Sequence, residues 1–437
     1  MNKFLIFLNT LCVSLLLFGN AQAAIALDGA EASPAYWTSR TAGMDKVLLD
    51  TKQIQQLNTE IRTKINTICD MKNFPATMTG SEIKTAITAS LPELRTYYTN
   101  GRLLTDAEYQ QFARQAEASA PAGASASAVR YAVTIKRADL RLLPTSDGWF
   151  DSPDPIDAHY DNLQATAVDP SEPLAVLADS ADGTYAFVQM RYYRGWIAKA
   201  ALAFTNRPVW LTYTEPKKFL VVTTNRYEIT QPAGSQLYQL GSKIPLAGQR
   251  DKQWLVRLPQ RNAAQQLIET TVRIPMDTAG LHEGFLPYTR ANILRSGFTL
   301  LGDVYGWGGV DNSVDCSSLI ADVFRTVGIE LPRDSDQQEI ACPQSLSLKG
   351  LDIAARHQAL TAAQPGAILF RSGHVMLYLG QNDLGNPCIL HSASSVYTQA
   401  NGQTQKHYIR QVIVSDLNAL HHMNNSLLTA LTSIGSL

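Results

Sequence analysis

The sequence is poor in charged residues. Only 17% of its 437 residues are Asp, Glu, Lys or Arg, while hydrophobic residues make up 45%, a balance that argues against a long disordered tail. The net charge is −1 and the isoelectric point is near 6.7. The chain therefore lacks the basic field that gathers nucleic-acid phosphates, and we expect no nucleic-acid partner.

Long apolar runs are confined to the first residues, MNKFLIFLNTLCVSLLLFGNAQA. One lysine precedes the apolar run, and the segment ends in the small-x-small pattern AQA that signal peptidase accepts. The run from 4 to 18 is short for a membrane span, which favours a cleaved secretory signal over residues 1–23 rather than a retained anchor. We expect export across the inner membrane to the periplasm or cell envelope, with no stable membrane insertion after cleavage.

Cysteines are few and scattered. Beyond the signal they are Cys69, Cys316, Cys342 and Cys388. Four cysteines in so long a chain are not a disulfide framework, although a pair such as Cys342 with Cys388 stays possible in an oxidising compartment. Because no CxxC or clustered Cys/His spacing occurs, the sequence predicts no metal site.

Length and pattern predict several domains, since 437 residues exceed what one hydrophobic core covers. Apolar residues recur at three- and four-residue spacing across 45–68, which predicts a helix. We therefore predict a domain over 24–125 that consists of a helical N-terminal segment followed by an alanine-rich linker. Next come short alternating runs with close turns, including a hairpin at ADSADGTY. They predict two small β-barrels, over 126–205 and 206–285.

A weak internal similarity supports two barrels, because GWI at 195–197 and GFL at 284–286 each end a β-rich region with a glycine, an aromatic and an aliphatic residue. Chance similarity is the competing explanation. From 286 to 437 the pattern changes to helices and then strands, and we expect a poorly ordered tail from Asn418. The predicted fold class is therefore a multidomain α+β protein: a helical N-terminal segment, two small barrels and a C-terminal α+β domain.

The segment YGWGGVDNSVDCSS, residues 305–318, runs directly into the apolar stretch LIADVF. Asp315 is suited to cap a helix that starts at Cys316, which would place the thiol in the first turn. The positive end of the helix dipole would then lower the pKa of the thiol and activate a nucleophile. The upstream glycines would let backbone approach a ligand closely.

A nucleophilic cysteine also needs a proton partner, and His374 in SGHVMLYLG is the best candidate. His391 in ILHSAS follows 17 residues later, so an antiparallel strand pair would set the two rings side by side and let His391 orient His374. Taken singly, each residue is more often a buried structural residue. Their combination favours a catalytic site.

These motifs resemble a known family. Three blocks, YGWGG with DCSSLI, GHVMLYLG, and ILHSAS, are similar to the three motif blocks of the NlpC/p60 cysteine peptidases, which have a papain-like core and cleave peptides of the bacterial cell wall. Upstream, SPAYWTSRTAGMDKVLLD with IQQLNTEI resembles the helical stabilising segment of the γ-D-glutamyl-L-diamino acid endopeptidase branch. ADLRLLPT with YRGWI resembles the first bacterial SH3-like domain of that branch, so the two barrels are expected to be SH3-like.

The resemblance implies hydrolysis of the amide bond between D-glutamate and the diamino acid of peptidoglycan stem peptides, or of fragments released from them, without a cofactor. By motif position Cys316 is the nucleophile, His374 the base and His391 the orienting residue. The residues expected to hold the substrate are Tyr305, Asp315, Ser317 and Ser335.

In relatives of this branch, an acidic residue and a tyrosine of the first SH3-like domain recognise the amino terminus of the substrate. Asp157, Asp161 and Tyr193 are candidates for these roles. Whether the substrate is the intact sacculus or a released peptide stays open, as do the diamino acid and the oligomeric state. Two other functions compete: a non-catalytic wall-binding protein with a decayed site, and an acyltransferase on the same scaffold.

Overall fold

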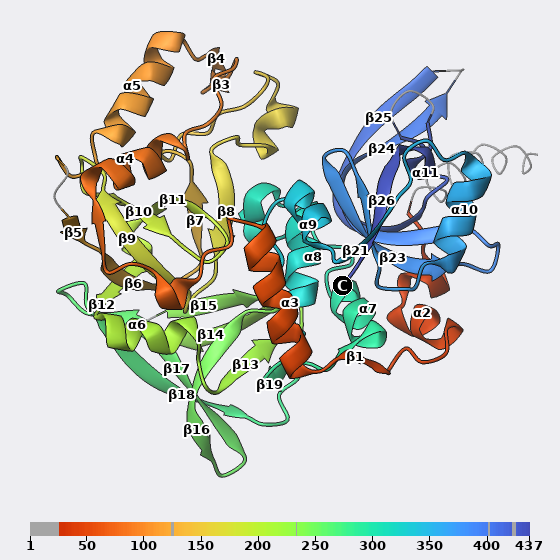
Figure 1. Cartoon of the computed structure of the whole chain (residues 1–437), viewed down its shortest axis with the longest axis horizontal. Helices are drawn as coiled ribbons and strands as arrows, with labels where there is room; N and C mark the ends of the chain where they lie inside the picture. The colour runs from red at the N-terminus through yellow and green to blue at the C-terminus, as the bar shows by residue number, and fades with distance from the viewer. Residues whose placement is uncertain (1–25, 124–125, 233, 401–402, 422–424) are drawn as a thin grey trace, which may run out of the picture.

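The computed structural model describes residues 26–123, 126–232, 234–400, 403–421 and 425–437 (Figure 1). The predicted signal over 1–23 lies outside these residues. Among the residues described, no helix is long and apolar enough to cross a membrane. The N-terminal elements are η1 (Gly29–Ala32), α2 (Pro34–Arg40), β1 (Val47–Leu49), α3 (Thr51–Lys64), η2 (Met71–Asn73), β2 (Thr77–Thr79), α4 (Gly80–Thr88), β3 (Tyr98–Thr99), β4 (Arg102–Leu103), α5 (Asp106–Glu117) and β5 (Ala126–Ala128).

Helix α3 starts later than the apolar spacing suggested. Its N-cap is Asp50, whose side chain accepts a hydrogen bond from the Gln53 amide at 2.9 Å while the Gln53 side chain accepts one from Asp50. This reciprocal cap fixes the first turn at residue 51. The residues before it form β1, which pairs with β20 (Tyr288–Thr289) and ties the N-terminal segment to the C-terminal part of the chain.

The first β unit is a seven-stranded antiparallel sheet in the order β12-β6-β9-β10-β11-β7-β8. The expected hairpin is present, with β9 and β10 joined through the ADSADGTY turn. The rings of Phe187 and Trp196 are buried in its core, 5.2 Å apart between centroids. Its elements are β6 (Arg130–Thr134), β7 (Ala138–Arg141), η3 (Pro155–His159), β8 (Gln164–Val168), β9 (Pro173–Asp179), β10 (Tyr185–Gln189), β11 (Arg194–Ala198), η4 (Lys199–Ala201) and β12 (Leu202–Thr205).

The second β unit follows α6 (Arg207–Thr214) and contains a five-stranded sheet, β18-β17-β16-β13-β19, beside the two-stranded ribbon β14-β15. The tripeptide similarity does not mark equivalent positions, because Trp196 is fully buried in β11 whereas Phe285 follows β19 and is 37% exposed. The strands are β13 (Phe219–Val222), β14 (Arg226–Gln231), β15 (Gly234–Gln239), β16 (Lys243–Arg250), β17 (Gln253–Arg261), β18 (Leu267–Pro275) and β19 (Leu281–Glu283).

The C-terminal unit is built on a six-stranded sheet, β21-β26-β22-β23-β24-β25. The expected disordered tail is wrong: β26 lies between β21 and β22, and its Leu431 and Ile434 are buried in the core. The elements are α7 (Arg290–Phe298), η5 (Trp307–Asn312), α8 (Cys316–Arg325), α9 (Ser335–Ala341), β21 (Gln344–Ser347), α10 (Ile353–Ala362), β22 (Ile368–Arg371), β23 (His374–Gln381), β24 (Pro387–Ala400), β25 (Gln403–Asp416), α11 (Leu427–Ala430) and β26 (Leu431–Ser436).

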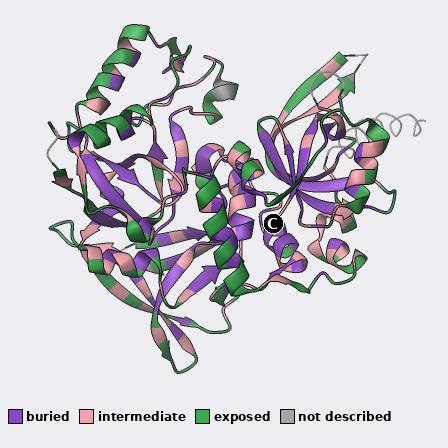
Figure 2. Cartoon of the chain, in the orientation of Figure 1, coloured by how far each residue is buried: buried purple, intermediate pink, exposed green. Residues whose placement is uncertain are grey.

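One apolar core joins the N-terminal helix to the C-terminal unit. Ile54, Leu57 and Ile61 of α3 belong to the same buried cluster as residues of α7, α8 and β23, and Figure 2 colours the buried residues of these elements purple. Cys342 and Cys388 are also buried in this cluster, and both are free thiols, so they do not form the disulfide left open above. Burial of these apolar side chains away from water stabilises the packing of the N-terminal segment on the C-terminal unit.

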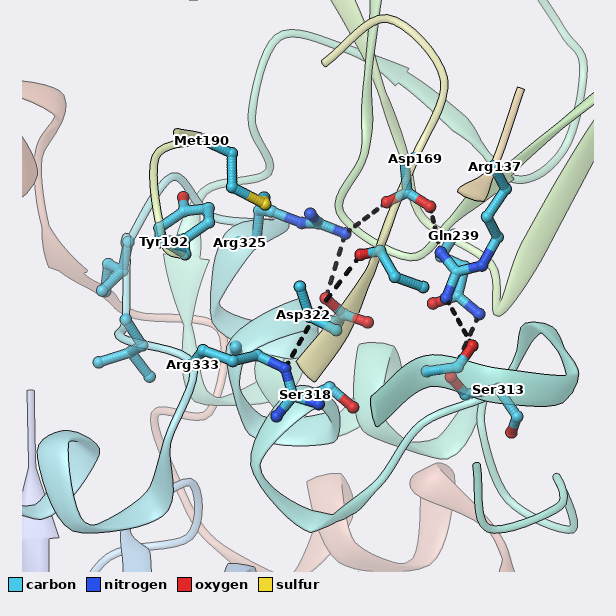
Figure 3. A pocket seen from close by; sticks show the side chains of 16 residues that line it. Arg137, Asp169, Met190, Tyr192, Gln239, Ser313, Ser318, Asp322, Arg325 and Arg333 are labelled. Carbon is cyan, nitrogen blue, oxygen red and sulfur yellow. Dashed lines mark hydrogen bonds and ion pairs between the residues drawn. The ribbon is translucent and has the colours of Figure 1, made fainter. Parts of the chain in front are cut away.

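The two β units and the C-terminal unit meet at a charged junction (Figure 3). Asp169 of the first unit is buried and forms ion pairs with Arg137 and with Arg325 of α8. It also accepts a hydrogen bond from Ser242 of the second unit at 2.6 Å. Burial raises the pKa of Asp169, but the two arginines outweigh it and the net direction is downward. A cavity of about 60 Å³ lies at this junction.

Candidate active site

Cys316 is the first residue of α8, as the sequence predicted. The carboxylate of Asp315 accepts a hydrogen bond from the Ser318 amide at 2.9 Å, and the Ser318 hydroxyl accepts one from the Asp315 amide at 2.9 Å. This capping box fixes the helix start. The buried side chains of Leu319 and Val323 anchor the helix in the core. The helix start and its buried face together set the position of the thiol.

The structure brings the two histidines together. His374 opens β23, and His391 lies on the neighbouring antiparallel strand β24. The His374 Nε2 and His391 Nδ1 atoms are 2.9 Å apart, and His391 Nε2 lies 3.0 Å from the Ser415 hydroxyl of β25. Both rings are buried. The sequence analysis did not identify Ser415 as part of the site.

The thiol lies beside the start of β23. Helix α8 packs against this strand, and the backbone amide of Val375, the residue after His374, lies close enough to the Cys316 sulfur to favour its thiolate form. Because His374 Nε2 is paired with His391, a proton exchange between His374 and the Cys316 sulfur would have to use Nδ1. The site therefore contains a spatial series of side chains: Cys316, His374, His391 and Ser415. This is the series expected for a nucleophile, its base and the groups that orient the base.

The expected lowering of the thiol pKa is wrong. Burial, reinforced by the negative charge of Asp315, raises the pKa of Cys316 to about 11; the Val375 amide and Arg333 offset this in part. Burial lowers the pKa of His374 well below its ordinary value and that of His391 to about 3. Near pH 7 the site therefore holds a neutral thiol beside neutral imidazoles.

This charge state predicts slow alkylation of Cys316 by iodoacetamide at pH 7. Only the thiolate reacts, so with a pKa near 11 the rate should rise about tenfold per pH unit between pH 7 and pH 10. Peptide mapping by mass spectrometry separates Cys316 from the other thiols, with Cys316→Ala as the blank. A rate that is already high and constant from pH 5 to pH 8 would indicate a thiolate–imidazolium pair instead.

Tyr305 lies at the site, buried, beside the first β unit. Burial, and then the nearby Cys316 thiol, raise its pKa above the ordinary value. Its ring centroid is 6.0 Å from that of Tyr160, which also contacts Trp307 at 6.0 Å. The Trp307 indole donates a hydrogen bond to the backbone oxygen of Asp161 at 3.0 Å. Tyr160 was missed by the sequence analysis, because no motif marks a residue that approaches from a different domain.

Asp315 and Ser317 are held by Arg333, a residue that the sequence analysis did not identify. The Arg333 guanidinium donates to Asp315 Oδ2 at 2.5 Å and to the Ser317 hydroxyl at 2.8 Å, and all three residues are buried. The Gly308 amide donates to Asp315 Oδ2 at 3.0 Å. Both carboxylate oxygens of Asp315 thus have donors within the protein, so Asp315 is placed to shape the helix start.

Gly308 and Gly309 of the YGWGG motif allow the C-terminal unit to pack closely against the first β unit. Gly308 and Gly309 have φ angles of 58° and 82°, and a Cβ on Gly308 would lie 2.6 Å from the Gln164 side chain of β8. Gln164 Nε2 donates to the Gly308 oxygen at 3.0 Å, and Arg333 Nε donates to Thr166 Oγ1 at 3.0 Å. The sequence analysis predicted that these glycines would let the backbone approach a ligand closely. In the structure it is the first β unit that lies against them.

The remaining candidates differ in their surroundings. Ser335 opens α9, is half-buried, and lies two residues from Arg333. The Asp161 carboxylate is occupied, accepting hydrogen bonds from Arg141 at 2.8 Å and from two backbone amides at 2.9 Å. Tyr193 is half-buried near Arg333, and the side chain of Asp157 lies outside the described part of the chain. Within that part, no group of three or more His, Cys, Asp or Glu residues is arranged to hold a metal ion.

Comparison with known proteins identifies two domains. Residues 302–415 match the model of the NlpC/P60 family, and residues 149–198 match the model of the SH3 domain (SH3b1 type). The chain therefore contains an NlpC/P60 domain and an SH3b1-type domain, and its fold is the predicted multidomain α+β architecture. A search of curated proteins finds no match.

One solved structure shares the fold over nearly the whole chain. An NlpC/P60 endopeptidase from Photobacterium damselae subsp. piscicida is similar with a TM-score of 0.73 at 17% identity, over 94% of this chain and 97% of that one. An NlpC/P60 family protein from Bacillus cereus ATCC 10987 gives a TM-score of 0.47 at 17% identity, over 70% of this chain and 99% of that one. The first of these likenesses extends the shared fold to nearly the whole chain.

Proposed function

We propose that the protein is a secreted cysteine endopeptidase that hydrolyses the D-glutamyl–diamino acid amide bond of peptidoglycan stem peptides. The observation that carries this proposal is the arrangement of Cys316 at the start of α8, beside β23, with His374 and His391 hydrogen-bonded at 2.9 Å. The NlpC/P60 domain supports a cell-wall peptide as substrate, and the predicted signal places the reaction in the cell envelope.

The Cys316 thiol and the His374 imidazole are both neutral before the reaction, so the first step must include a proton transfer between them. As the Cys316 sulfur attacks the amide carbonyl carbon, His374 takes the thiol proton at Nδ1, and the C–N bond breaks when the imidazolium returns this proton to the leaving amine. Water then hydrolyses the thioester, with His374 as base, to give a free acid and the thiol. The backbone amide of Cys316, at the helix start, is suited to hold the oxyanion.

The test is direct identification of products. We expect purified enzyme to convert L-Ala-γ-D-Glu-diaminopimelate into L-Ala-D-Glu and free diaminopimelate, read by mass spectrometry. A parallel incubation with intact sacculi shows whether the uncleaved wall is also a substrate. Transfer of the acyl group to an amine or alcohol would identify an acyltransferase, and tight binding without any product would identify a wall-binding protein.

His391 is expected to affect turnover more than binding. Without it His374 loses its hydrogen-bonded partner and its fixed ring orientation, so His391→Ala should lower kcat about 100-fold with a change in KM below about 3-fold. Ser415→Ala, which removes the next hydrogen bond in the series, should have a smaller effect in the same direction. Steady-state kinetics on the tripeptide measure both, and an unchanged kcat in His391→Ala would remove His391 from the mechanism.

A further inference from the structure

A cleft of about 1000 Å³ lies where the N-terminal segment, the two β units and the C-terminal unit meet, and we call it the Lys243 cleft. Its walls come from α3, the end of α6, strands β13 and β16, the loop 284–288 and the residues that follow α8. Cys316 begins the 10-residue helix α8, which is about 15 Å long, so the cleft lies at the opposite end of this helix from the thiol. None of the residues that line the cleft belongs to the candidate active site.

Basic side chains outnumber acidic ones in the lining of the Lys243 cleft. The basic ones are Arg62, Lys72, Arg191, Lys217 and Lys243, and the acidic ones are Asp50, Glu215 and Glu330. Each acidic side chain already has a donor within the protein. Asp50 caps α3, and Glu215 pairs with Lys72 at 3.0 Å. Glu330 pairs with Arg191 at 3.2 Å and with Arg62 at 3.7 Å. The lining therefore has positive charge that its own carboxylates do not neutralise.

Lys243 brings this positive charge to the wall of the cleft. It opens β16, is half-buried, and forms no hydrogen bond or ion pair with any described residue. Its Nζ lies 5.9 Å from the centre of the Phe219 ring. Burial, and then the charge of Arg191, lower the pKa of Lys243 from its ordinary value, although Glu330 and Glu172 act in the opposite direction. A half-buried ammonium group without a partner costs free energy, and a bound anion would remove part of that cost.

An aromatic pair lines the cleft beside this ammonium group. The rings of Phe219 and Phe285 meet edge to face, with their centroids 4.8 Å apart, and Phe285 is 37% exposed. Pro216 and Leu286 extend the apolar surface. A volume of this size at a junction between domains, with apolar walls and a few polar groups, is typical of a ligand site. The lining therefore suits a ligand that combines an apolar part with a negative charge.

The donors that remain free decide the kind of anion. Glu330 engages the guanidinium groups of both Arg62 and Arg191, so the two forks that would suit a phosphate are occupied. The ammonium group of Lys243 is a single point charge, which suits a group with one negative charge such as a carboxylate.

We propose that the Lys243 cleft is a second binding site, which takes the free carboxylate end of a short acidic peptide. The carboxylate accepts a hydrogen bond from Lys243 Nζ, and an apolar part of the peptide packs on Phe219 and Phe285. The source of this peptide rests on the proposed function: the hydrolysis leaves a free carboxylate on the D-glutamyl fragment, and the stem peptides of the wall also end in free carboxylates.

Lysine footprinting tests the site at residue level. The Cys316→Ala protein, which leaves wall peptides uncleaved, is acetylated with an N-hydroxysuccinimide ester, with and without L-Ala-D-Glu, and each lysine is mapped by mass spectrometry. We expect saturating dipeptide to slow the acetylation of Lys243 about tenfold. Lys218, an exposed lysine outside the lining, should be acetylated at an unchanged rate. A parallel arm with sacculi in place of the dipeptide distinguishes wall-attached peptides from released ones as the source.

Variants at position 243 measure what the ammonium group contributes. In a calorimetric titration of the same protein with the dipeptide, Lys243→Met should raise the Kd of this site roughly 10- to 100-fold, the range of a charge-assisted hydrogen bond. The binding that remains is that of the active site. Lys243→Arg should keep most of the affinity because it keeps the charge, and Lys218→Met is the matched control and should change nothing. Since Lys243 has no partner to lose, Lys243→Met should unfold at no lower temperature than the parent protein.

The outcomes separate this inference from the proposed function. Acetylation of Lys243 at the same rate with and without both ligands, or an unchanged titration in Lys243→Met, would overturn the second site while the endopeptidase stands. Protection of Lys243 is measured in a protein without the catalytic thiol, so it does not depend on cleavage. If the wild-type protein cleaves no stem peptide, the proposed function itself fails.

Discussion

Replacing Cys316 with alanine is expected to lower kcat/KM on a stem peptide by at least about 10⁴-fold. The sulfur forms the covalent bond of the acyl-enzyme, and no other described thiol shares its place between α8 and β23. The fold should be unaffected, because the helix cap is made by the Asp315 side chain and backbone amides rather than by the thiol.

Cys69→Ala is the matched control, since Cys69 is also a half-buried free thiol and packs against a different apolar cluster, which the N-terminal segment shares with the first β unit. It should retain full activity. Both variants are measured by release of the diamino acid and by thermal unfolding. Activity of Cys316→Ala within tenfold of wild type, with the control also active, would refute the covalent mechanism.

Replacing Arg333 with methionine is expected to cost about 3–5 kcal/mol in the free energy of unfolding. The substitution leaves the Asp315 carboxylate buried without its cation, and an uncompensated buried charge is among the most destabilising changes known. It also removes the hydrogen bond to Thr166, and with it a contact between the first β unit and the C-terminal unit. Urea unfolding monitored by tryptophan fluorescence measures the loss.

Two comparisons make that result specific. Combining Arg333→Met with Asp315→Asn should recover part of the loss, because the amide can still cap α8 and no charge is left buried. Arg40→Met breaks an ion pair whose Asp383 side chain is 75% exposed, and it should cost less than about 1 kcal/mol. Equal losses in Arg333→Met and Arg40→Met would contradict the structural role given to Arg333.

The parts of the site that the sequence predicted are those set by local rules. An aspartate before Cys316 and an apolar run after it specify a capped helix start, which the structure has. The spacing of His374 and His391 fits two adjacent antiparallel strands, and the rings meet. In each case the residues that decide the geometry lie within about 20 positions of each other, so pattern and register suffice.

The parts that the sequence did not predict depend on distant contacts. Tyr160 reaches Tyr305 across 145 positions, a separation that no local pattern encodes. The C-terminal strand β26 lies in the stretch that was predicted to be a poorly ordered tail, and its pairing with the distant strands β21 and β22 places it in the sheet. The thiol pKa was predicted in the wrong direction, because the helix dipole is visible in the sequence while the burial of Cys316 is not.

The most direct measurement is detection of the acyl-enzyme. The protein is mixed with an activated ester of L-Ala-γ-D-Glu, quenched in acid within milliseconds, digested and mapped by mass spectrometry. The account predicts a thioester on Cys316 that accumulates before steady state, and much slower formation of this thioester in His374→Ala, where the thiol lacks its base. Turnover of the ester with no acyl group on Cys316, or with the acyl group on another residue, would contradict it.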